Sequence, residues 1–324
     1  MNILITGASG FLGKKIYDKL KENQSNRLVG TYSSDRDGKI RELRDNRDFQ
    51  DFLKFDISEE SSVDKLDKEV MKRFGKKPDF VIHCAAMTDV DYCELHKEEA
   101  HLINAKGTES LAKHFKQGFI YISTDFVFDG EKGNYSEKDL PKPPNHYALT
   151  KYLGEKAVQE NCDDYMILRV AVLYGASSNK KKFTNWAVDQ LKGKNTIRVV
   201  TDQICTPTLI DDIASGLKRL IIIKKGDESK KEKKYANNKR GEPNIFHVAG
   251  SQKLSRYDMA LEIADTFGFD RKLIIPIKSS DLNQVAKRPK DSSLDISKIK
   301  KLGIKMSSFQ EGIRKVKEQM EAIT

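Results

Sequence analysis

The sequence predicts an α/β fold, a doubly wound parallel sheet with a smaller interleaved α/β lobe. Three observations support this prediction. A glycine-rich turn follows an apolar run near the N-terminus, at residues 6–13. Strand-like and helix-like segments then alternate over the first 170 residues, which is typical of a parallel sheet. After residue 170 the alternation loosens. This indicates a second lobe over the carboxyl ends of the strands, where open α/β sheets bind ligands.

The glycine-rich turn joins the first predicted strand, residues 2–6, to the first predicted helix, residues 10–23. Gly7 lets the chain turn tightly, and Gly10 lets backbone N–H groups approach a pyrophosphate. Gly13 lets the helix pack closely on the strand, and the start of the helix favours an anion. We therefore expect a dinucleotide-binding domain of the Rossmann type.

The cofactor preference depends on the end of the second strand, residues 27–32, which meets the adenosine ribose in such folds. Ser33, Ser34 and Arg36 follow this strand. Their hydroxyls and guanidinium suit a 2′-phosphate, because Arg offers planar charge-assisted hydrogen bonds. We therefore predict NADPH, with NADH left open because Asp35 stands among them.

The other elements of the first 170 residues follow the same alternation. The third strand, residues 52–57, ends with Asp56 and Ile57 on the expected adenine side. Residues 79–85 form an apolar run typical of a strand buried on both faces, and the small Ala85 and Ala86 would let a cofactor lie close. The remaining predicted elements are helices at 58–74, 94–116 and 144–160 and strands at 119–124 and 166–170.

Two domains are expected, an NAD(P)-binding domain at 1–170 and a mainly substrate-binding lobe at 171–324. We expect segments near 197–223 and 244–250 to return to the first domain. Residues 224–242, KKGDESKKEKKYANNKRGE, almost lack apolar side chains and predict a flexible basic insertion. The predicted elements of the second half are helices at 183–191, 208–223, 255–267 and 308–321 and strands at 244–248 and 273–276.

Composition argues against several functional classes. The 324 residues carry a net charge of +10, but the excess lies in dispersed lysines and in the 224–242 run, so nucleic-acid binding is not expected. No run approaches the roughly 20 apolar residues of a membrane span. The four cysteines are scattered without a C-x-x-C pair, so we expect no disulfides, no metal site and a cytoplasmic location. A homodimer is left open.

The chemistry is expected at Tyr147 and Lys151, which lie four residues apart on one face of the predicted helix. A lysine ammonium about 4 Å from a phenol, at an effective dielectric constant near 20, contributes roughly 4 kcal/mol, or about three pKa units. That would bring the phenol pKa to about 7, where general acid catalysis works best. We expect the hydroxyl of Thr124, at the end of the fifth strand, to hold one carbonyl oxygen together with Tyr147.

Seven segments occur in order along the chain. They are GASGFLG at 7–13, HCAAMTDVD at 83–91, NAKGT at 104–108, STDFVFDG at 123–130, YALTK at 147–151, DQICTPT at 202–208 and RPKDSSLD at 288–295. Together they resemble the dTDP-4-dehydrorhamnose reductase family of the extended short-chain dehydrogenase/reductases. The resemblance covers nearly the whole chain apart from residues 224–242, and STDFVFDG and RPKDSSLD are its most specific segments.

The resemblance implies reduction of the 4-keto group of a nucleoside-diphosphate deoxysugar, with dTDP-4-dehydrorhamnose as the expected substrate and dTDP-L-rhamnose as the product. It implies catalytic roles for Thr124, Tyr147 and Lys151. The implied cofactor contacts are Gly7, Gly10, Phe11, Leu12, Gly13, Ala85, Ala86, Asn104, Tyr147 and Lys151. The implied sugar-nucleotide contacts are Thr88, Val90, Thr124, Asp125, Phe126 and Arg288.

Departures from the family pattern keep other functions open. Phe126 replaces a frequent tyrosine, and Val172 stands where many members have a tryptophan that packs on the sugar. The stretch RVAVLYG at 169–175 also resembles the regulatory subunit of methionine adenosyltransferase, a non-catalytic relative that binds an enzyme partner. A related 4,6-dehydratase would need a carboxylic acid at position 126, whereas an epimerase or another sugar-nucleotide reductase stays open.

Overall fold

The structure, a computed structural model, describes residues 1–33, 50–177, 182–226 and 244–322. Ser34, Arg36 and most of the insertion predicted at 224–242 lie outside these ranges. The chain divides into two compact units. The first comprises Met1–Ser123, Asn145–Leu168 and Leu217–Ile245, and the second comprises Thr124–Pro144, Arg169–Gly216 and Phe246–Thr324.

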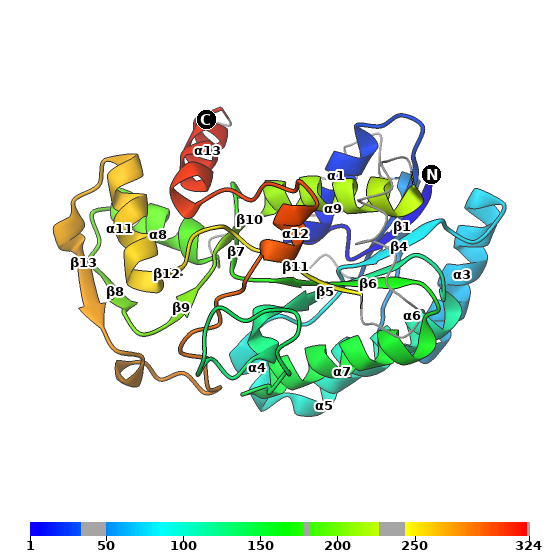
Figure 1. Ribbon diagram of the computed structural model, residues 1–324, viewed down its shortest axis with the longest axis horizontal. Coiled ribbons are helices and arrows are strands. Elements are labelled where there is room, and N and C mark those ends of the chain that lie inside the picture. Colours follow the sequence, from blue (N-terminus) through cyan, green and yellow to red (C-terminus); the bar gives the residue numbers. More distant parts are fainter. Residues whose placement is uncertain (34–49, 178–181, 227–243, 323–324) are drawn as a thin grey trace. The chain divides into compact units, whose positions relative to one another are not determined.

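A seven-stranded sheet runs through the first unit in the order β11-β6-β5-β4-β1-β2-β3 (Figure 1). The strands are β1 (Asn2–Thr6), β2 (Arg27–Tyr32), β3 (Phe52–Lys54), β4 (Phe80–His83), β5 (Phe119–Thr124), β6 (Tyr165–Val170) and β11 (Ile245–His247). The last residues of β5, β6 and β11 are assigned to the second unit. Strand β1 pairs in parallel with both β2 and β4. The chain therefore winds outward from β1 in both directions, which confirms the predicted doubly wound α/β fold.

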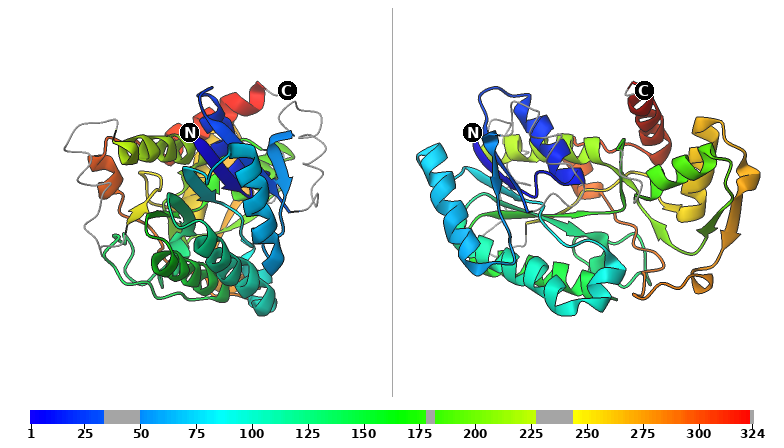
Figure 2. Two further views of the ribbon diagram at one scale, coloured as in Figure 1. Left: turned by 90° about the vertical axis from the view of Figure 1, so that its right-hand side faces the viewer. Right: turned by 180° about the vertical axis from the view of Figure 1, so that it is seen from behind.

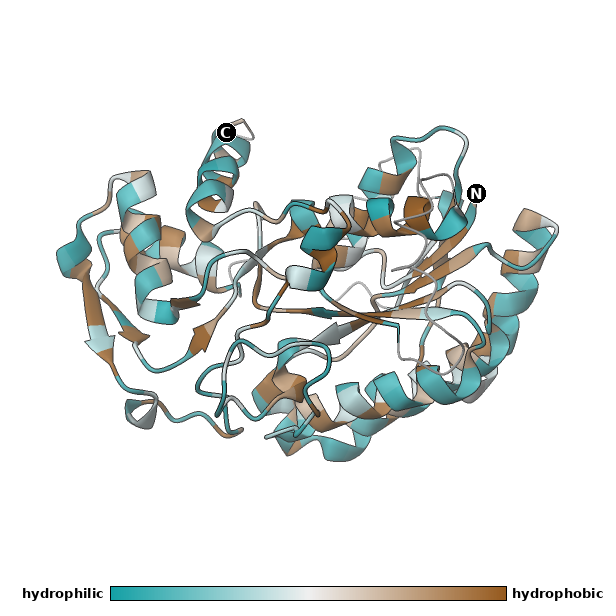
Figure 3. Ribbon diagram, in the orientation of Figure 1, coloured by the Kyte–Doolittle hydropathy of each residue, from teal (hydrophilic) through white to brown (hydrophobic). Residues whose placement is uncertain are grey.

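Helices cover both faces of this sheet. Helices α3 (Glu60–Phe74), α6 (Gly107–His114) and α7 (His146–Asn161) lie on one face (Figure 1, Figure 2). On the other face α1 (Phe11–Lys21) lies with the C-terminal part of α9 (Ile210–Lys225). The central strands are hydrophobic, whereas the outer sides of the helices are largely hydrophilic (Figure 3). Every residue of β1 and β4 is buried, as parallel strands covered on both faces require.

The long helix predicted at 94–116 is broken into shorter pieces. These are α4 (Val90–Leu95), α5 (Lys97–His101), the π-helical turn η2 (Leu102–Lys106) and α6. The first break occurs because His96 has non-helical dihedral angles, φ −122° and ψ 62°. Asn104 lies in the π-helical turn, and such turns are frequent at functional sites.

The second unit packs three helices around its own apolar core. They are α8 (Phe183–Lys192), α11 (Arg256–Phe267) and α13 (Phe309–Glu321). Capping boxes at Ser255 and Ser308 fix the starts of α11 and α13. Three strand pairs are β7 (Leu173–Tyr174) with β10 (Thr208–Leu209), β8 (Ile197–Val200) with β13 (Ile274–Ile277), and β9 (Ile204–Cys205) with β12 (Leu254–Ser255). Short helical elements are η3 (Asp125–Val127), η4 (Arg271–Leu273), η5 (Ser279–Asp281) and α12 (Ser297–Lys301).

The unit boundaries differ from the predicted boundary at residue 170. Residues 124–144 group with the second unit, because this segment is bonded to residues 291–295 there. Residues 217–245 group with the first unit, and residues 197–216 and 246–250 with the second. That one unit binds the cofactor and the other the substrate stays a prediction.

Candidate functional site

The glycine-rich turn of the first unit requires glycine at two positions. Gly7 has a φ of +68°, and a Cβ there would lie 2.7 Å from the backbone N of Ala85. A Cβ on Gly13 would lie 2.2 Å from the Gly7 carbonyl oxygen. The Gly10 N–H donates to that same oxygen at 2.9 Å, and Gly10 is the N-cap of α1. The start of α1 is therefore held against the loop after β4, with no side chain between them.

A buried hydrogen-bonded group lies beside this turn. The Thr6 hydroxyl is 2.7 Å from His83 Nδ1, and the Thr108 hydroxyl is 3.0 Å from His83 Nε2. Because the Thr108 hydroxyl donates to the Asn104 carbonyl oxygen, Nε2 donates to Thr108 and Nδ1 accepts from Thr6. Burial, assisted by the charge of Lys151, lowers the pKa of His83 to about 3, so the imidazole is neutral.

Asn104 connects the loop after β4 to α7. Its side-chain oxygen accepts from the Met87 N–H at 2.9 Å, and its amide donates to the Met87 carbonyl at 3.0 Å. The amide also donates to the Thr150 hydroxyl at 3.1 Å, which donates in turn to the Tyr147 carbonyl at 2.9 Å. These bonds fix the loop at 85–88 relative to the first turn of α7.

Helix α7 carries Tyr147 and Lys151 among its buried residues. The Asn145 side chain caps the helix by accepting from the Ala148 N–H at 2.9 Å. Lys151 is only 3 % exposed, and its Nζ lies 4.1 Å from the centre of the Tyr121 ring on β5. Tyr147 is 9 % exposed. The buried face of one helix thus holds a phenol and an amine one turn apart.

Burial changes the charge expected of this lysine. Desolvation lowers the pKa of Lys151 to about 7, although the Glu155 carboxylate opposes the shift. An amine with that pKa is about half protonated at pH 7. The full positive charge that the sequence predicts for Lys151 is therefore reached only well below pH 7.

A buried carboxylate ties the end of β5 to α7. The Ser123 hydroxyl donates to Glu155 Oε1 at 2.5 Å, and the two residues are 2 % and 1 % exposed. Glu155 follows Lys151 by about one helical turn. Because Thr124 is the next residue in the chain, this bond fixes the strand end from which Thr124 continues.

In the second unit, Thr124 and Asp125 form a buried pair. The Thr124 hydroxyl donates to Asp125 Oδ1 at 3.1 Å and accepts from the Phe126 N–H at 3.2 Å. The Ser292 hydroxyl donates to Asp125 Oδ2. Desolvation raises the pKa of Asp125 to about 6, although both hydroxyl bonds oppose the shift. The carboxyl group therefore changes charge in the mildly acidic range.

The segments STDFVFDG and RPKDSSLD are joined in the second unit. A Cβ on Gly130 would lie 2.5 Å from the Pro289 Cβ, and the Asp291 N–H donates to the Gly130 carbonyl at 3.0 Å. Their connection continues at Tyr135, whose N–H donates to the Ser293 carbonyl at 2.8 Å. The two segments that are most typical of the family therefore contact each other, which gives a structural reason for their sequence pattern.

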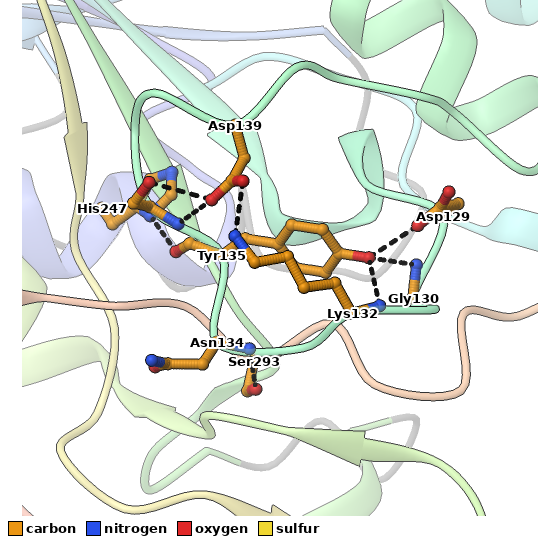
Figure 4. Close-up of polar contacts among 9 residues, drawn as sticks. Asp129, Gly130, Lys132, Asn134, Tyr135, Asp139, His247 and Ser293 are labelled. Carbon is orange, nitrogen blue, oxygen red and sulfur yellow. Dashed lines mark hydrogen bonds and ion pairs between the residues drawn. The ribbon is translucent and has the colours of Figure 1, made fainter.

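Figure 4 shows Tyr135 at the centre of the polar contacts that connect these two segments. Its hydroxyl donates to Asp129 Oδ1 at 2.6 Å and accepts from the Gly130 N–H at 3.1 Å. Its carbonyl accepts from His247 Nδ1 at 3.0 Å. Burial, assisted by the charge of Arg169, lowers the pKa of His247 to about 3. A neutral imidazole and a phenol therefore hold the chain that follows Thr124.

The other residues predicted to contact the cofactor differ in how far they are exposed. Phe11 and Leu12 open α1, and Ala85 and Ala86 are half-buried. Ser33 is exposed. Asp56 accepts from the Ser58 hydroxyl at 2.6 Å, as in a turn. Ile57 is 8 % exposed and packs in the core of the first unit. Their contacts with a cofactor stay predictions.

The predicted sugar contacts are divided between the units. Thr88 and Val90 are in the first unit, and Phe126 and Arg288 are in the second. Thr88 is exposed, whereas Arg288 is half-buried and its Nη1 donates to the Ala286 carbonyl at 2.8 Å. Val172 has a φ of +36°, a genuine outlier for a β-branched residue. The position that replaces the family's tryptophan therefore has a strained backbone.

Sequence reasoning missed His83, Glu155 and Ser292. No single histidine, glutamate or serine carries a signal without knowledge of its partners. Ser292 lies within the recognised RPKDSSLD segment, and His83 is the first residue of the recognised HCAAMTDVD segment. Those two segments were the available pointers to them. Glu155 extends the Tyr147–Lys151 spacing by another four residues, and this extension is visible in the sequence.

The first unit fits a dinucleotide. Gly7, Gly10 and Gly13 themselves carry no side chain that could block a phosphate, and the first turn of α1 holds no acidic residue. Within the described ranges, no cluster of three or more His, Cys, Asp or Glu side chains suits a metal ion. Among the same residues, no helix has the length and apolar character needed to cross a membrane.

Comparison with known proteins gives matches over nearly the full chain. Residues 1–322 match the family model described as the RmlD substrate binding domain. Methionine adenosyltransferase 2 subunit beta of Danio rerio is 31% identical over 320 residues, covering 96% of this chain and 88% of the relative. The probable low-salt glycan biosynthesis reductase Agl14 of Haloferax volcanii is 31% identical over 325 residues, covering 97% and 96%. The structure of dTDP-4-dehydrorhamnose reductase from Bacillus anthracis in complex with NADP is 27% identical with a TM-score of 0.77, covering 98% and 99%.

Proposed function

The chain belongs to the family described as the RmlD substrate binding domain, and on this premise we propose that it reduces the 4-keto group of a nucleoside-diphosphate deoxysugar with NADPH. The proposed substrate is dTDP-4-dehydrorhamnose, the product is dTDP-L-rhamnose, and NADH is the alternative donor. The observation that carries the proposal is the buried Lys151 one turn after Tyr147, in the unit that also holds the glycine-rich turn. The NADP complex of the Bacillus anthracis reductase supports the choice of cofactor.

Each residue has a defined role in the proposed reaction. When bound, NADPH supplies a hydride to the carbonyl carbon. The turn at Gly7–Gly13 would hold the pyrophosphate at the start of α1. Tyr147 of the first unit donates its phenolic proton to the carbonyl oxygen. That the Thr124 hydroxyl contacts the same oxygen stays a prediction from the sequence. Protonated Lys151 favours the loss of that phenolic proton, because its charge stabilises the phenolate.

Tyr147→Phe tests the proton donor. Loss of a positioned general acid should slow NADPH oxidation with dTDP-4-dehydrorhamnose by about 10²-fold or more. Tyr152→Phe is the matched control, because Tyr152 lies on the same helix one residue after Lys151 and has its own lysine four residues later. Equal turnover in the wild type and Tyr147→Phe would reject the assignment. A panel of other nucleotide-linked keto sugars, assayed in parallel, identifies the preferred substrate.

Gly7→Ala tests the cofactor site without any sugar. The added Cβ would meet the Ala85 backbone, so NADPH affinity in a fluorescence titration should fall by at least tenfold, an order-of-magnitude expectation for a displaced phosphate turn. Gly75→Ala is the control, because Gly75 has a similar φ of +75° with no atom within 4 Å of the added Cβ. Equal affinity in both variants would argue against a pyrophosphate at this turn.

A second function is supported by a specific observation. The chain is 31% identical to methionine adenosyltransferase 2 subunit beta of Danio rerio. A non-catalytic regulatory subunit would co-purify with the catalytic subunit of a methionine adenosyltransferase and reduce no keto sugar. If the protein reduces a keto sugar and this activity depends on Tyr147, the reductase function is supported and the non-catalytic one is rejected.

A further inference from the structure

Asp125 is a buried ionisable group with hydroxyl partners on both carboxyl oxygens. Oδ1 accepts from Thr124 at 3.1 Å, and Oδ2 accepts from Ser292. Asp125 is 3 % exposed and Thr124 is 6 % exposed. The hydrogen bond between them decides what the Thr124 hydroxyl can offer to a ligand.

The Thr124 hydroxyl has one proton and two lone pairs. One lone pair accepts from the Phe126 N–H at 3.2 Å. While Asp125 is ionised, the hydroxyl proton points to Oδ1, because a carboxylate can only accept. The remaining lone pair can accept from an alcohol, but a ketone oxygen has no proton to give it. Thr124 beside an ionised Asp125 therefore suits the alcohol product and not the ketone.

Protonation of Asp125 reverses this arrangement. A carboxylic acid has an O–H donor, which can point to the Thr124 oxygen while Ser292 continues to donate to the other carboxyl oxygen. The Thr124 proton is then released toward a ligand. We propose that Asp125 is a positioning residue that sets the direction of the Thr124 hydroxyl, as a donor to the ketone when protonated and as an acceptor from the alcohol when ionised. The proposal rests on the proposed ketone reduction.

The surroundings of Asp125 place this change in a measurable pH range. Desolvation raises the pKa of Asp125 to about 6, and the Arg256 guanidinium on α11 is among the groups that oppose the shift. Cys205 on β9 also interacts electrostatically with the carboxyl, but burial raises its pKa to about 12, so it stays a neutral thiol.

The neighbouring carboxylate, Asp291, has its own cation. It forms an ion pair with Lys253, and it also accepts from the Ser293 hydroxyl at 2.6 Å. Arg256 and Asp125 are therefore the charged side chains whose mutual effect must be considered in a titration of Asp125.

A titration without substrate tests the carboxyl group. Carboxyl ¹³C NMR spectra of the wild type and Asp125→Asn should differ by one resonance that titrates at about pH 6. Thr124→Val should raise that midpoint, because the Thr124 bond lowers the pKa of Asp125. Asp139, whose pKa is lowered to about 2 by its bonds to Lys132 and Ser136, is the reference that should not move. A midpoint below pH 5, or one that Thr124→Val leaves unchanged, would overturn the proposal.

The pH dependence of ketone reduction tests the consequence. Above about pH 6, wild-type turnover should fall by up to about tenfold per pH unit, following the protonated fraction of Asp125. Asp125→Asn keeps an amide donor toward Thr124 and an acceptor toward Ser292, so this descending limb should vanish. Asp125→Ala lacks both groups and should be slow at every pH. Deprotonation of Lys151 above about pH 7 gives a separate limb that Asp125→Asn retains.

The outcomes separate the two proposals. An Asp125→Asn variant that keeps the limb at about pH 6, or that is as slow as Asp125→Ala, contradicts the role of Asp125. If no keto sugar is reduced while the Asp125 resonance still responds to Thr124→Val, the proposed function fails and the coupling of the two side chains stands.

Discussion

Helix α7 contains one residue pattern twice, and the two copies differ in burial. Tyr147, Lys151 and Glu155 form an inner set, and Tyr152, Lys156 and Glu160 form an outer set. Lys151 and Glu155 are 3 % and 1 % exposed, whereas Lys156 and Glu160 are exposed. Five residues rotate a helix position by about 140°, so the sets point in different directions. The comparison teaches that spacing places groups on one face, whereas burial shifts the pKa of a group toward the value that catalysis needs.

The largest expected effect is the loss of the inner lysine. Lys151→Met should lower turnover by about 10³-fold, because the phenol then loses the cation that favours proton release. Lys156→Met, in the outer set, should leave turnover within a factor of two of the wild type. Steady-state NADPH oxidation at pH 6.5 measures both. Similar turnover in the two variants would remove the distinction between the sets.

The second expected effect is on stability as a function of pH. The folded pKa of Lys151 is about 7, and the unfolded value is about 10.4, so the unfolded chain binds the proton more tightly between them. The free energy of unfolding should therefore rise with pH in this window, by at most about 1.4 kcal/mol per unit from this group.

Denaturant unfolding from pH 7 to 10 measures this slope in the wild type, Lys151→Met and Lys156→Met. The inner substitution should reduce the slope by about one proton, and the outer substitution should not. A Lys151→Met variant with the wild-type slope would show that the lysine is not held in a desolvated site.

The third effect concerns the bond from β5 to the inner set. Ser123→Ala leaves the buried Glu155 carboxylate without its 2.5 Å hydroxyl donor, so the free energy of unfolding should fall by about 2 kcal/mol. In the double variant with Glu155→Gln, the cost of removing Ser123 should be smaller, because the neutral amide needs the donor less. If the losses in free energy of unfolding from the two substitutions were strictly additive, the bond between Ser123 and Glu155 would not contribute to stability.

The smallest effect is expected for Glu155→Gln. The Glu155 carboxylate raises the pKa of Lys151, so its neutralisation should lower that pKa further. The descending limb of the pH–rate profile that is due to Lys151 should then move to lower pH. At pH 7 the expected loss of turnover is about fivefold. Glu160→Gln is the matched outer variant and should leave the profile unchanged. A limb that stays in place in Glu155→Gln would contradict the electrostatic role.

Much of the fold is predictable from local sequence. Strands β1 and β4, in which every residue is buried, are predictable because parallel strands covered on both faces have continuous apolar sequences. The glycine-rich turn is predictable from the sequence because only glycine fits where Gly7 and Gly13 approach other backbone atoms.

Other features depend on distant contacts and are not predictable in this way. The break at His96 leaves the helical pattern of side chains almost unchanged. The assignment of residues 124–144 to the second unit arises from bonds to residues 291–295, far along the chain.

The candidate site was predictable to the same limited extent. Tyr147 and Lys151 lie on one helix, as predicted. Tyr152 and Lys156 have the same spacing on that helix, so spacing alone does not identify the candidate catalytic pair. The pKa of Lys151 depends on its burial and on charge interactions with Glu155, Cys84 and Cys93, which come from separate segments of the chain. Asp125 and Ser292 meet although 167 positions separate them in the sequence.

The chain changes from one unit to the other at residues 124, 145, 169, 217 and 246. Neither unit therefore corresponds to a continuous stretch of gene. No single crossover between two homologous genes could exchange one whole unit and leave the other intact, and no terminal truncation could yield either unit alone. Diversification of such a chain has to proceed by substitutions within an intact framework, because its parts cannot be shuffled as separate modules.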